Sequence, residues 1–406
     1  MDDQLDIQVS CSHIENPEPG KNDPVIKDGH LIKWEAIGDV VLPDEVEFID
    51  RQAFRGAMEM TRLTLNANVK SIGEAAFLLC SELHEITVPA ENNNFMSIGG
   101  VVYSKDGKKL IVYPGGKTES HYTLPAIVDE VVPGALLTTP RIKEVAVEEG
   151  NAHYGIMGKG LVRLADKAMV YYPNADFMNL EAEPKLTIDS GIEIIGRYAL
   201  AYIPALSAIE LPLNLKKIEA CACMAAGGLS KISAPQGYEN SQLTLEEIAD
   251  SAFFYNMSIE ELPFIPTLKK IGNEAFARNY NLLAVNIPAE CKIGHKAFDF
   301  VMALNSIRCF GRTPSKIDNE TFTNIMSIDD VVLEVPVECI DVYAAAEGWK
   351  NFINIQEFDA DVETGIVDVR AAQAEDNRYY TLDGRVVAYP VKNTVYIYHG
   401  KKIIFR

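Results

Sequence analysis

The sequence contains no apolar run of about 18 residues, the length that an α-helix needs to cross a bilayer. Its first thirty residues also lack the apolar stretch of a secretory signal peptide. Basic residues are scarce, because 37 Lys and Arg stand against 58 Asp and Glu and leave a net charge of −21. Such a charge repels nucleic acid and anionic lipid. We therefore expect no membrane insertion and no nucleic-acid partner.

Catalytic and metal-binding motifs are missing as well. The chain has no Gly-x-Ser-x-Gly, Gly-x-x-x-x-Gly-Lys-Ser/Thr, His-Glu-x-x-His or Gly-x-Gly-x-x-Gly. Its seven cysteines form no Cys-x-x-Cys pair, and their odd number leaves at least one free thiol. Cys221 and Cys223 lie too close together for a typical zinc pair, and no second pair accompanies them. We predict no catalytic residue, no metal site and no cofactor.

The chain does contain a repeat. The phrase Ile-x-x-x-Ala-Phe recurs, and its last position, here called the Phe slot, is occupied by Phe54, Phe77, Leu136, Leu200, Cys223, Phe253, Phe276, Phe298 and Phe322. Nine residues after each slot stands the centre of an apolar-x-x-apolar-x-apolar string: Leu63, Ile86, Val145, Ile209, Ile232, Leu262, Val285, Ile307 and Val331. A tenth string surrounds Val40. The period is about 23 residues, which predicts a stacked solenoid in which each coil buries the apolar face of the next.

Three insertions interrupt the period. Residues 100–114 and 160–173 each read as two short strands around a turn, and Asp106-Gly107 supplies the turn in the first. We expect these to be β-hairpins that protrude from the array, within insertions of about 91–123 and 150–185. The third insertion, residues 236–242, is predicted to be a surface loop. Between the insertions we expect one continuous parallel sheet of about ten short strands, with Phe77, Phe253, Phe276 and Phe298 stacked in one internal ladder.

The repeats resemble a known family. Strings such as Val69-Lys70-Ser71-Ile72-Gly73-Glu74-Ala75-Ala76-Phe77, followed by Leu-x-x-Ile-x-Val-Pro, are similar to the BspA-like leucine-rich repeats of surface and secreted Bacteroidetes proteins. The resemblance implies a β-rich α/β solenoid, a right-handed superhelix, over residues 25–358, with a capping segment over 335–358. The chain departs from the pattern at Cys223 and Leu136, where the Phe slot holds a smaller residue.

The ends of the chain differ from this array. Residues 1–24 are expected to form a flexible extension, and residues 359–375 a linker. Residues 376–406, with 6 basic and 2 acidic residues, resemble the β-rich tail of exported Bacteroidetes proteins and predict a small C-terminal β unit. A strand cluster that packs on the solenoid is the other interpretation of this tail.

The candidate ligand-binding residues flank the buried strand centres and should line the concave face. The face is polar and mildly acidic, and it lacks the aromatic row of a glycan-stacking platform. Arg62, Lys231 and Arg308 are its isolated cations and are expected to give specificity. Tyr103, Tyr113, Tyr171 and Tyr172 form a rival surface on the hairpins. The candidate set is Arg62, Thr64, Glu85, Thr87, Glu144, Glu210, Lys231, Ser233, Glu261, Asn286, Arg308 and Asp330.

These patterns lead to a functional hypothesis. The family resemblance implies a non-enzymatic surface or secreted protein that mediates protein–protein interaction or adhesion, with a macromolecular ligand such as a host extracellular protein. The alternative is a glycan-binding accessory protein of a polysaccharide-uptake system. An extracellular or cell-surface location follows if an export signal is absent from the sequence given, and the cytoplasm remains the other compartment.

Overall fold

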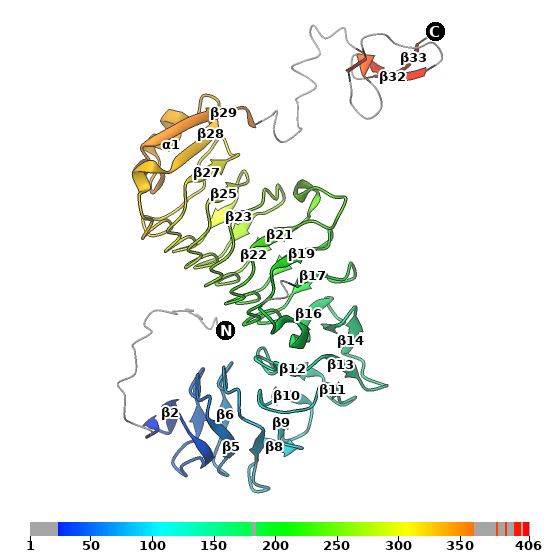
Figure 1. The fold of residues 1–406 in the computed structure, drawn as a ribbon, viewed down its shortest axis with the longest axis vertical. Coiled ribbons are helices and arrows are strands. Elements are labelled where there is room, and N and C mark those ends of the chain that lie inside the picture. Colours follow the sequence, from blue (N-terminus) through cyan, green and yellow to red (C-terminus); the bar gives the residue numbers. More distant parts are fainter. Residues whose placement is uncertain are drawn as a thin grey trace, which may run out of the picture.

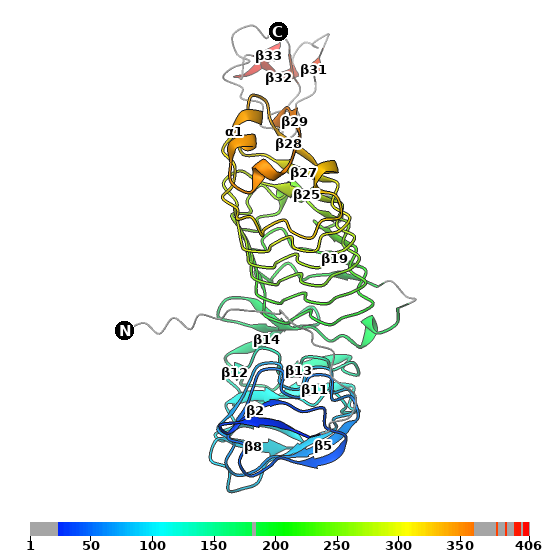
Figure 2. The same cartoon turned by 90° about the vertical axis from the view of Figure 1, so that its left-hand side faces the viewer.

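The computed structural model describes residues 23–180 and 184–360, together with the backbone of four short strands between residues 379 and 405 (Figure 1). In these ranges the chain forms a β-solenoid, and Figure 2 shows the coils of its green and yellow part stacked as parallel rungs. The N-terminal extension and the linker fall largely outside the described residues, as does Cys11.

A first row of strands contains nine of the ten predicted string centres, all except Val331, and it also includes strands that the strings did not predict. Neighbouring strands are parallel, with Leu63 opposite Ile86 and Ile209 opposite Ile232. These centres are buried because alternate residues of a strand point to opposite faces. The row consists of β3 (Gly38–Val41), β5 (Met60–Thr64), β7 (Glu85–Thr87), β11 (His121–Leu124), β13 (Glu144–Val147), β17 (Lys185–Thr187), β19 (Ala208–Glu210), β21 (Lys231–Ser233), β23 (Glu261–Leu262), β25 (Ala284–Ile287), β27 (Ser306–Cys309), β28 (Val332–Pro336) and β29 (Asn354–Phe358).

The prediction of one continuous sheet is wrong. The first row is divided into four sheets, β3-β5-β7, β11-β13, β17-β19-β21 and β23-β25-β27-β28-β29. The three breaks coincide with the three insertions. The hairpin regions separate β7 from β11 and β13 from β17, and residues 236–242, which include η2 (Asn240–Gln242), separate β21 from β23. At each insertion the first-row strands on either side belong to different sheets and do not pair.

A second row of mostly two-residue strands was not predicted. Most of its strands end at the Ile of the Ile-x-x-x-Ala-Phe phrase, so that Ile218, Ile248 and Ile271 lie side by side. Residues of both rows share one core cluster. The coil-derived members are β2 (His30–Lys33), β4 (Phe48–Ile49), β6 (Ser71–Ile72), β12 (Glu130–Val131), β18 (Ile194–Ile195), β20 (Lys217–Ile218), β22 (Glu247–Ile248), β24 (Lys270–Ile271) and β26 (Lys292–Ile293), and β1 (Val25–Lys27) pairs with β2.

The hairpins are part of the second row and do not merely protrude from it. Each is a three-stranded antiparallel unit whose last strand pairs in parallel with the next coil, β10 with β12 and β16 with β18. Asp106 makes the predicted turn, and its carboxylate accepts hydrogen bonds from the Ser104 hydroxyl and the Lys108 amide. The strands are β8 (Phe95–Ile98), β9 (Val101–Ser104) and β10 (Lys109–Val112), then β14 (Tyr154–Met157), β15 (Gly160–Arg163) and β16 (Ala168–Tyr171).

The Phe slots form two stacks and not a single ladder. Phe77 stacks only on Phe54, at a ring-centroid distance of 5.1 Å, in a separate N-terminal core cluster. The second stack runs through Phe253, Phe276, Phe298 and Phe322, with centroids 5.0–5.6 Å apart. The smaller residues Leu136, Leu200 and Cys223 occupy the slots between the two stacks and are buried there.

The C-terminal end of the stack is capped by α1 (Ile340–Ala345), η4 (Trp349–Asn351) and β29. The Tyr343 hydroxyl donates to the Gly311 carbonyl at 2.7 Å, and the Trp349 indole N–H donates to the Ser315 carbonyl at 2.7 Å. The remaining 3-10 helices are η1 (Ala175–Phe177) and η3 (Ile328–Asp330). A separate four-stranded antiparallel sheet holds β30 (Tyr379–Tyr380), β31 (Val386–Val387), β32 (Thr394–Tyr398) and β33 (Lys401–Phe405).

The turns around the Phe slots, here called the turn face, have a regular backbone. The residue two positions after every slot has a positive φ, between 53° and 81°. Amides and carbonyls of adjacent turns also pair, as from the Tyr255 amide to the Ala277 carbonyl at 3.0 Å. Adjacent coils are thus joined by a turn ladder in addition to the two strand rows.

Candidate functional site

The candidate residues of the first row point away from the core, and we call this surface the strand face. Because the row is broken into four sheets, the twelve residues do not form one continuous surface. In the N-terminal sheet, Arg62 of β5 lies 3.2 Å from Asp39 and 3.7 Å from Glu85. Thr64 is opposite Thr87 in the parallel register. These four candidates are therefore brought together around one arginine.

The middle sheets place their candidates in separate pairs. Glu144 of β13 lies 3.3 Å from the His121 imidazole of β11. Glu210 of β19 forms an ion pair with Lys185 of β17 and accepts a 2.7 Å hydrogen bond from Thr187. The hydrogen bonds from Lys185 and Thr187 hold the pKa of Glu210 below its usual value. Glu210 is thus buried in a polar network within the sheet.

Lys231 and Ser233 of β21 extend that sheet, opposite Ala208 and Glu210. No carboxylate of the described residues lies within 4 Å of the Lys231 ammonium group. Lys231 is exposed, and Ser233 is half-buried. Of the three cations predicted to be isolated, Lys231 alone fits that description within the described part of the chain.

The other two cations are paired with carboxylates of the same chain. Arg62 contacts two carboxylates, as described above. Arg308 of β27 donates from Nε and Nη2 to the Glu334 carboxylate of β28, at 2.7 and 2.8 Å. A fork of this kind is among the strongest ion-pair geometries. The sequence pattern missed it because the strand after β27 is shifted by two residues.

Asp330 is misplaced for the same reason. The expected centre at Val331 precedes β28, in which Leu333 pairs with Ile307 and Glu334 with Arg308. Asp330 lies in η3 and accepts a 2.6 Å hydrogen bond from Ser327. It is therefore not a strand-face residue, and Glu334 takes its place. The longer segment between the Phe322 slot and β28 causes the shift.

The C-terminal sheet also carries an aromatic cluster that the sequence analysis missed. Phe264 stacks on Phe310 at a centroid distance of 3.8 Å, and Phe358 meets Phe310 edge-on at 5.3 Å. The Arg308 guanidinium lies over the Phe358 ring at 5.1 Å. All three rings are half-buried. Phe264 and Phe310 follow the buried centres Leu262 and Ile307 by two and three residues, so the pattern could have revealed these two if it had been followed past the centre.

The two other candidates lie beside this cluster. The Asn286 amide of β25 donates to the Glu261 carboxylate of β23 at 3.2 Å and to the Leu262 carbonyl at 3.0 Å. Asn286 is opposite Arg308 in the register. Glu261, Asn286 and Arg308 are thus the predicted residues that the five-stranded sheet brings together with aromatic rings.

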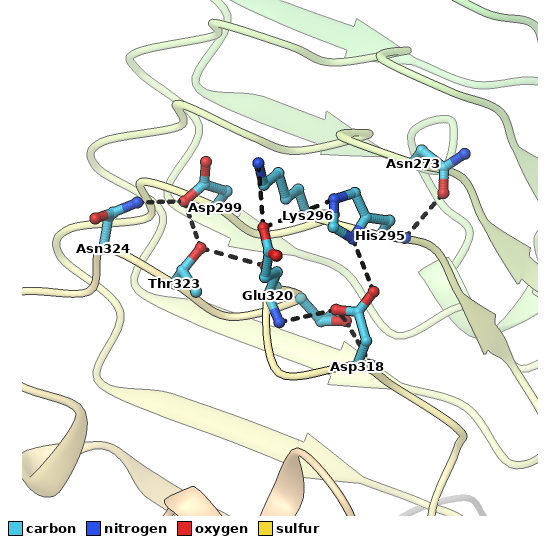
Figure 3. Close-up of polar contacts among 9 residues, drawn as sticks. Asn273, His295, Lys296, Asp299, Asp318, Glu320, Thr323 and Asn324 are labelled. Atoms are coloured by element: carbon cyan, nitrogen blue, oxygen red, sulfur yellow. Dashed lines mark hydrogen bonds and ion pairs between the residues drawn. The ribbon is translucent and has the colours of Figure 1, made fainter. Parts of the chain in front are cut away.

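The turn face holds a second polar group (Figure 3). The His295 Nδ1 atom lies 2.8 Å from an Asp318 carboxylate oxygen, and Lys296 lies 3.2 Å from Glu320. Asp299 accepts hydrogen bonds from Thr323 at 2.6 Å and Asn324 at 2.7 Å. Nothing in the repeat pattern distinguished these residues, since they come from turns of different coils.

The hairpin tyrosines do not form a rival surface. Tyr103, Tyr113 and Tyr171 are buried, and only Tyr172 of the four is half-buried. The Tyr103 and Tyr122 hydroxyls lie 3.1 Å apart, and the Tyr171 hydroxyl lies 2.8 Å from that of Thr139. Their rings and hydroxyls are used in packing.

The described cysteines are all buried free thiols. Burial raises the pKa of Cys80 and of Cys291 to about 12, so both are protonated at neutral pH. The described ranges contain no group of three or more His, Cys, Asp or Glu side chains arranged to hold a metal ion. They also contain no helix long and apolar enough to traverse a lipid bilayer.

The geometry defines a class of protein first: a β-solenoid scaffold with exposed side chains on stacked coils. The family comparison is more specific. The BspA type leucine rich repeat region matches as six copies, over residues 24–115, 172–298 and 240–350. The chain belongs to this family. Leucine-rich-repeat proteins of this type are generally non-enzymatic scaffolds that bind macromolecules.

Several solved structures are similar to the chain. The pneumococcal vaccine antigen PcpA is 19% identical, with 79% of this chain and 78% of that chain covered and a TM-score of 0.49. A leucine-rich cell surface protein from Faecalibacterium prausnitzii is 21% identical, with coverages of 68% and 79% and a TM-score of 0.43. A leucine-rich repeat protein from Bacteroides ovatus is 16% identical, with coverages of 84% and 100% and a TM-score of 0.29. Among curated proteins, none matches.

Proposed function

We propose that this chain is a secreted or surface-displayed adhesion protein that binds another protein through the strand face of its C-terminal sheet. The observation that carries the proposal is the aromatic cluster Phe264, Phe310 and Phe358 beside the Arg308–Glu334 pair. Aromatic residues and arginine supply most of the binding energy in protein interfaces. Here they lie together on a parallel sheet, which holds them rigidly.

The polar residues around the cluster suit the rim of such an interface. Glu261 and Asn286 are positioned on strands of the same sheet and can exchange solvent for hydrogen bonds with a partner. Charged residues at a rim act chiefly on the association rate and on the choice of partner. With a net charge of −21, the chain favours a partner whose contact surface is basic.

Parallel arrays of purified extracellular proteins and of glycans test the class of ligand. The proposal expects a protein ligand that the variant Phe310→Ser binds at least about tenfold more weakly, a loss of ~1.4 kcal/mol. Phe48→Ser changes a half-buried phenylalanine of β4, outside the C-terminal sheet, so it is the matched control and should retain the affinity. Retained binding by Phe310→Ser, with the parent's melting temperature, would remove the site from this face.

Charge reversal at two cations of the strand face, Lys231 and Arg308, separates an effect on association from an effect on folding. Lys231→Glu changes an unpaired charge and is expected to slow association in a salt-dependent way. Arg308→Glu instead leaves Glu334 beside a second carboxylate, and we expect it to weaken both binding and folding. Interferometry at two salt concentrations, together with thermal melts, separates these two effects.

A further inference from the structure

A hollow of about 390 Å³ opens on the turn face, away from the strand face. Two half-buried rings, Phe254 and Phe300, form its apolar lining. Its polar lining includes Glu274, Asp299 and Asn324. The volume falls within the range of small-molecule sites, in which apolar walls combine with a few polar groups.

The backbone of Phe300 has the left-handed conformation, which is unfavourable for a bulky side chain. Its φ is 55°, and the equivalent residue in the first coil is Gly56, with a φ of 81°. A left-handed conformation is an outlier for a bulky residue, whereas glycine adopts it freely. Tyr202 and Tyr255 occupy the same position of their coils, with φ of 58° and 62°. The positive φ is shared by every turn of the array, so it is a property of the repeat, and the coils differ in which side chain stands at this position.

The polar groups of the hollow are of mixed sign. Arg278 lies over the Phe300 ring at 4.9 Å, and Lys296 pairs with Glu320 at 3.2 Å. Asp299 is oriented by Thr323 and Asn324 (Figure 3). Burial raises the pKa of Glu274, which lines the same hollow. Oriented acceptors and donors therefore lie beside two aromatic rings.

This lining excludes some ligand classes. A cationic ligand would meet Arg278 and Lys296, and an anionic ligand would meet Glu274, Asp299 and Glu320. A sugar hydroxyl both donates and accepts hydrogen bonds, so it is compatible with both sets. The C–H face of a pyranose ring is apolar and stacks on aromatic side chains.

We propose that the hollow binds one neutral hexose unit of a glycan, stacked on Phe300 and Phe254, with its hydroxyls bonded to Asp299, Asn324 and Arg278. This site is distinct from the protein-binding strand face. The adhesin would then contact a glycan and a protein through different surfaces.

Isothermal titration calorimetry of the full chain with maltohexaose, cellohexaose, mannohexaose and β-galactohexaose tests the proposal. We expect at least one of these to bind, and Phe300→Ala to weaken that binding at least about tenfold, a loss of ~1.4 kcal/mol. Phe300→Tyr keeps the ring and should retain affinity. Phe48→Ala changes a half-buried phenylalanine of β4 that belongs to neither proposed site, so it is the matched control and should bind as the parent does.

Two results would overturn the proposal. One is the failure of all four oligosaccharides to bind at millimolar concentrations, and the other is unchanged affinity in Phe300→Ala. If Phe300→Ala melts below the assay temperature, Phe254→Ala removes the second ring and must show the same loss. Neither result affects the protein-binding proposal, because the variants that test it, Phe310→Ser, Lys231→Glu and Arg308→Glu, lie outside the hollow.

Discussion

Phe276 lies fully buried between Phe253 and Phe298, with ring centroids 5.2 and 5.6 Å away. Removing its ring would leave a cavity that the flanking coils cannot close, since each is fixed by hydrogen bonds to its neighbours. We expect Phe276→Ala to lower the free energy of unfolding by about 3–5 kcal/mol. Chemical denaturation measures this, with the half-buried Phe264→Ala as the milder comparison. A loss below about 1 kcal/mol would contradict the core assignment.

The pKa values of two glutamates are shifted in opposite directions, and the two shifts predict opposite effects on stability at neutral pH. Because the pKa of Glu210 is lower in the folded chain than in the unfolded one, its ionised carboxylate stabilises the fold above about pH 4.3, the pKa of an unfolded glutamate. This stabilisation is lost as the pH falls through the lower pKa of the folded state. Burial raises the pKa of Glu274, so its charge at neutral pH disfavours the folded state. Glu210→Gln should lower the melting temperature at pH 7, whereas Glu274→Gln should leave it unchanged or raise it.

Melting curves from pH 7 to about pH 3 check both variants. The difference between Glu210→Gln and the parent should shrink towards acid pH, and that of Glu274→Gln should vanish once the carboxyl is protonated in both states. Shifts of the same sign at pH 7 would contradict the assigned environments.

At the scale of single elements, the sequence predicted the strand centres well because burial there requires apolar side chains at a fixed spacing. Leu63, Ile209 and Ile307 all lie at buried positions of the first row. The second row was missed because a two-residue strand such as Ile248 with Glu247 has no alternation to detect. Its pairing depends on the neighbouring coil, and the sequence of one coil does not show it.

The candidate site was less predictable than the fold. Arg308 appeared isolated because its partner Glu334 is 26 residues away, outside the 23-residue register. The hollow on the turn face joins Phe254, Glu274, Phe300 and Asn324, each from a different coil. Side chains that vary between repeats make such sites, whereas periodicity reveals only what the repeats share.

The positive-φ turns allow a prediction at this scale. Ala225 has a φ of 55°, where an alanine is disfavoured by roughly 1–2 kcal/mol and a glycine is not. The greater freedom of glycine in the unfolded chain costs about 0.5–1 kcal/mol. Ala225→Gly is therefore expected to raise stability by up to about 1 kcal/mol in denaturant titrations.

Its neighbour supplies the control. Ala226 is fully buried and is absent from the positive-φ positions. Ala226→Gly should lower the free energy of unfolding. It removes a packed methyl group and increases the conformational entropy of the unfolded chain, and it relieves no strain in the fold. Equal losses from both variants would show that the turn conformation carries no strain.

The whole molecule has several cores in series, because each coil contacts mainly its neighbours. Trp34 belongs to the N-terminal core cluster and Trp349 to the C-terminal one, and the chain has only two tryptophans. We expect their fluorescence to report two different unfolding transitions, which the variants Trp34→Phe and Trp349→Phe isolate.

Phe276→Ala distinguishes the two transitions. It should shift the transition that Trp349 reports and leave that of Trp34 in place. Coincident transitions for both probes in the parent and in Phe276→Ala would instead show that the stack unfolds as one cooperative unit.

The breaks in the strand rows also determine how the protein responds to a pulling force. At the loop of residues 236–242 only the first row stops. The second row continues there through the pair β20-β22, and the turn ladder continues through the hydrogen bond from the Ala225 amide to the Phe254 carbonyl. Between β12 and β14 both rows stop, and the coils are linked by side chains such as Tyr154, whose hydroxyl accepts from the Val131 amide at 2.8 Å. Under a pulling force we therefore expect the hairpin region to yield before the five-stranded sheet β23-β25-β27-β28-β29 does.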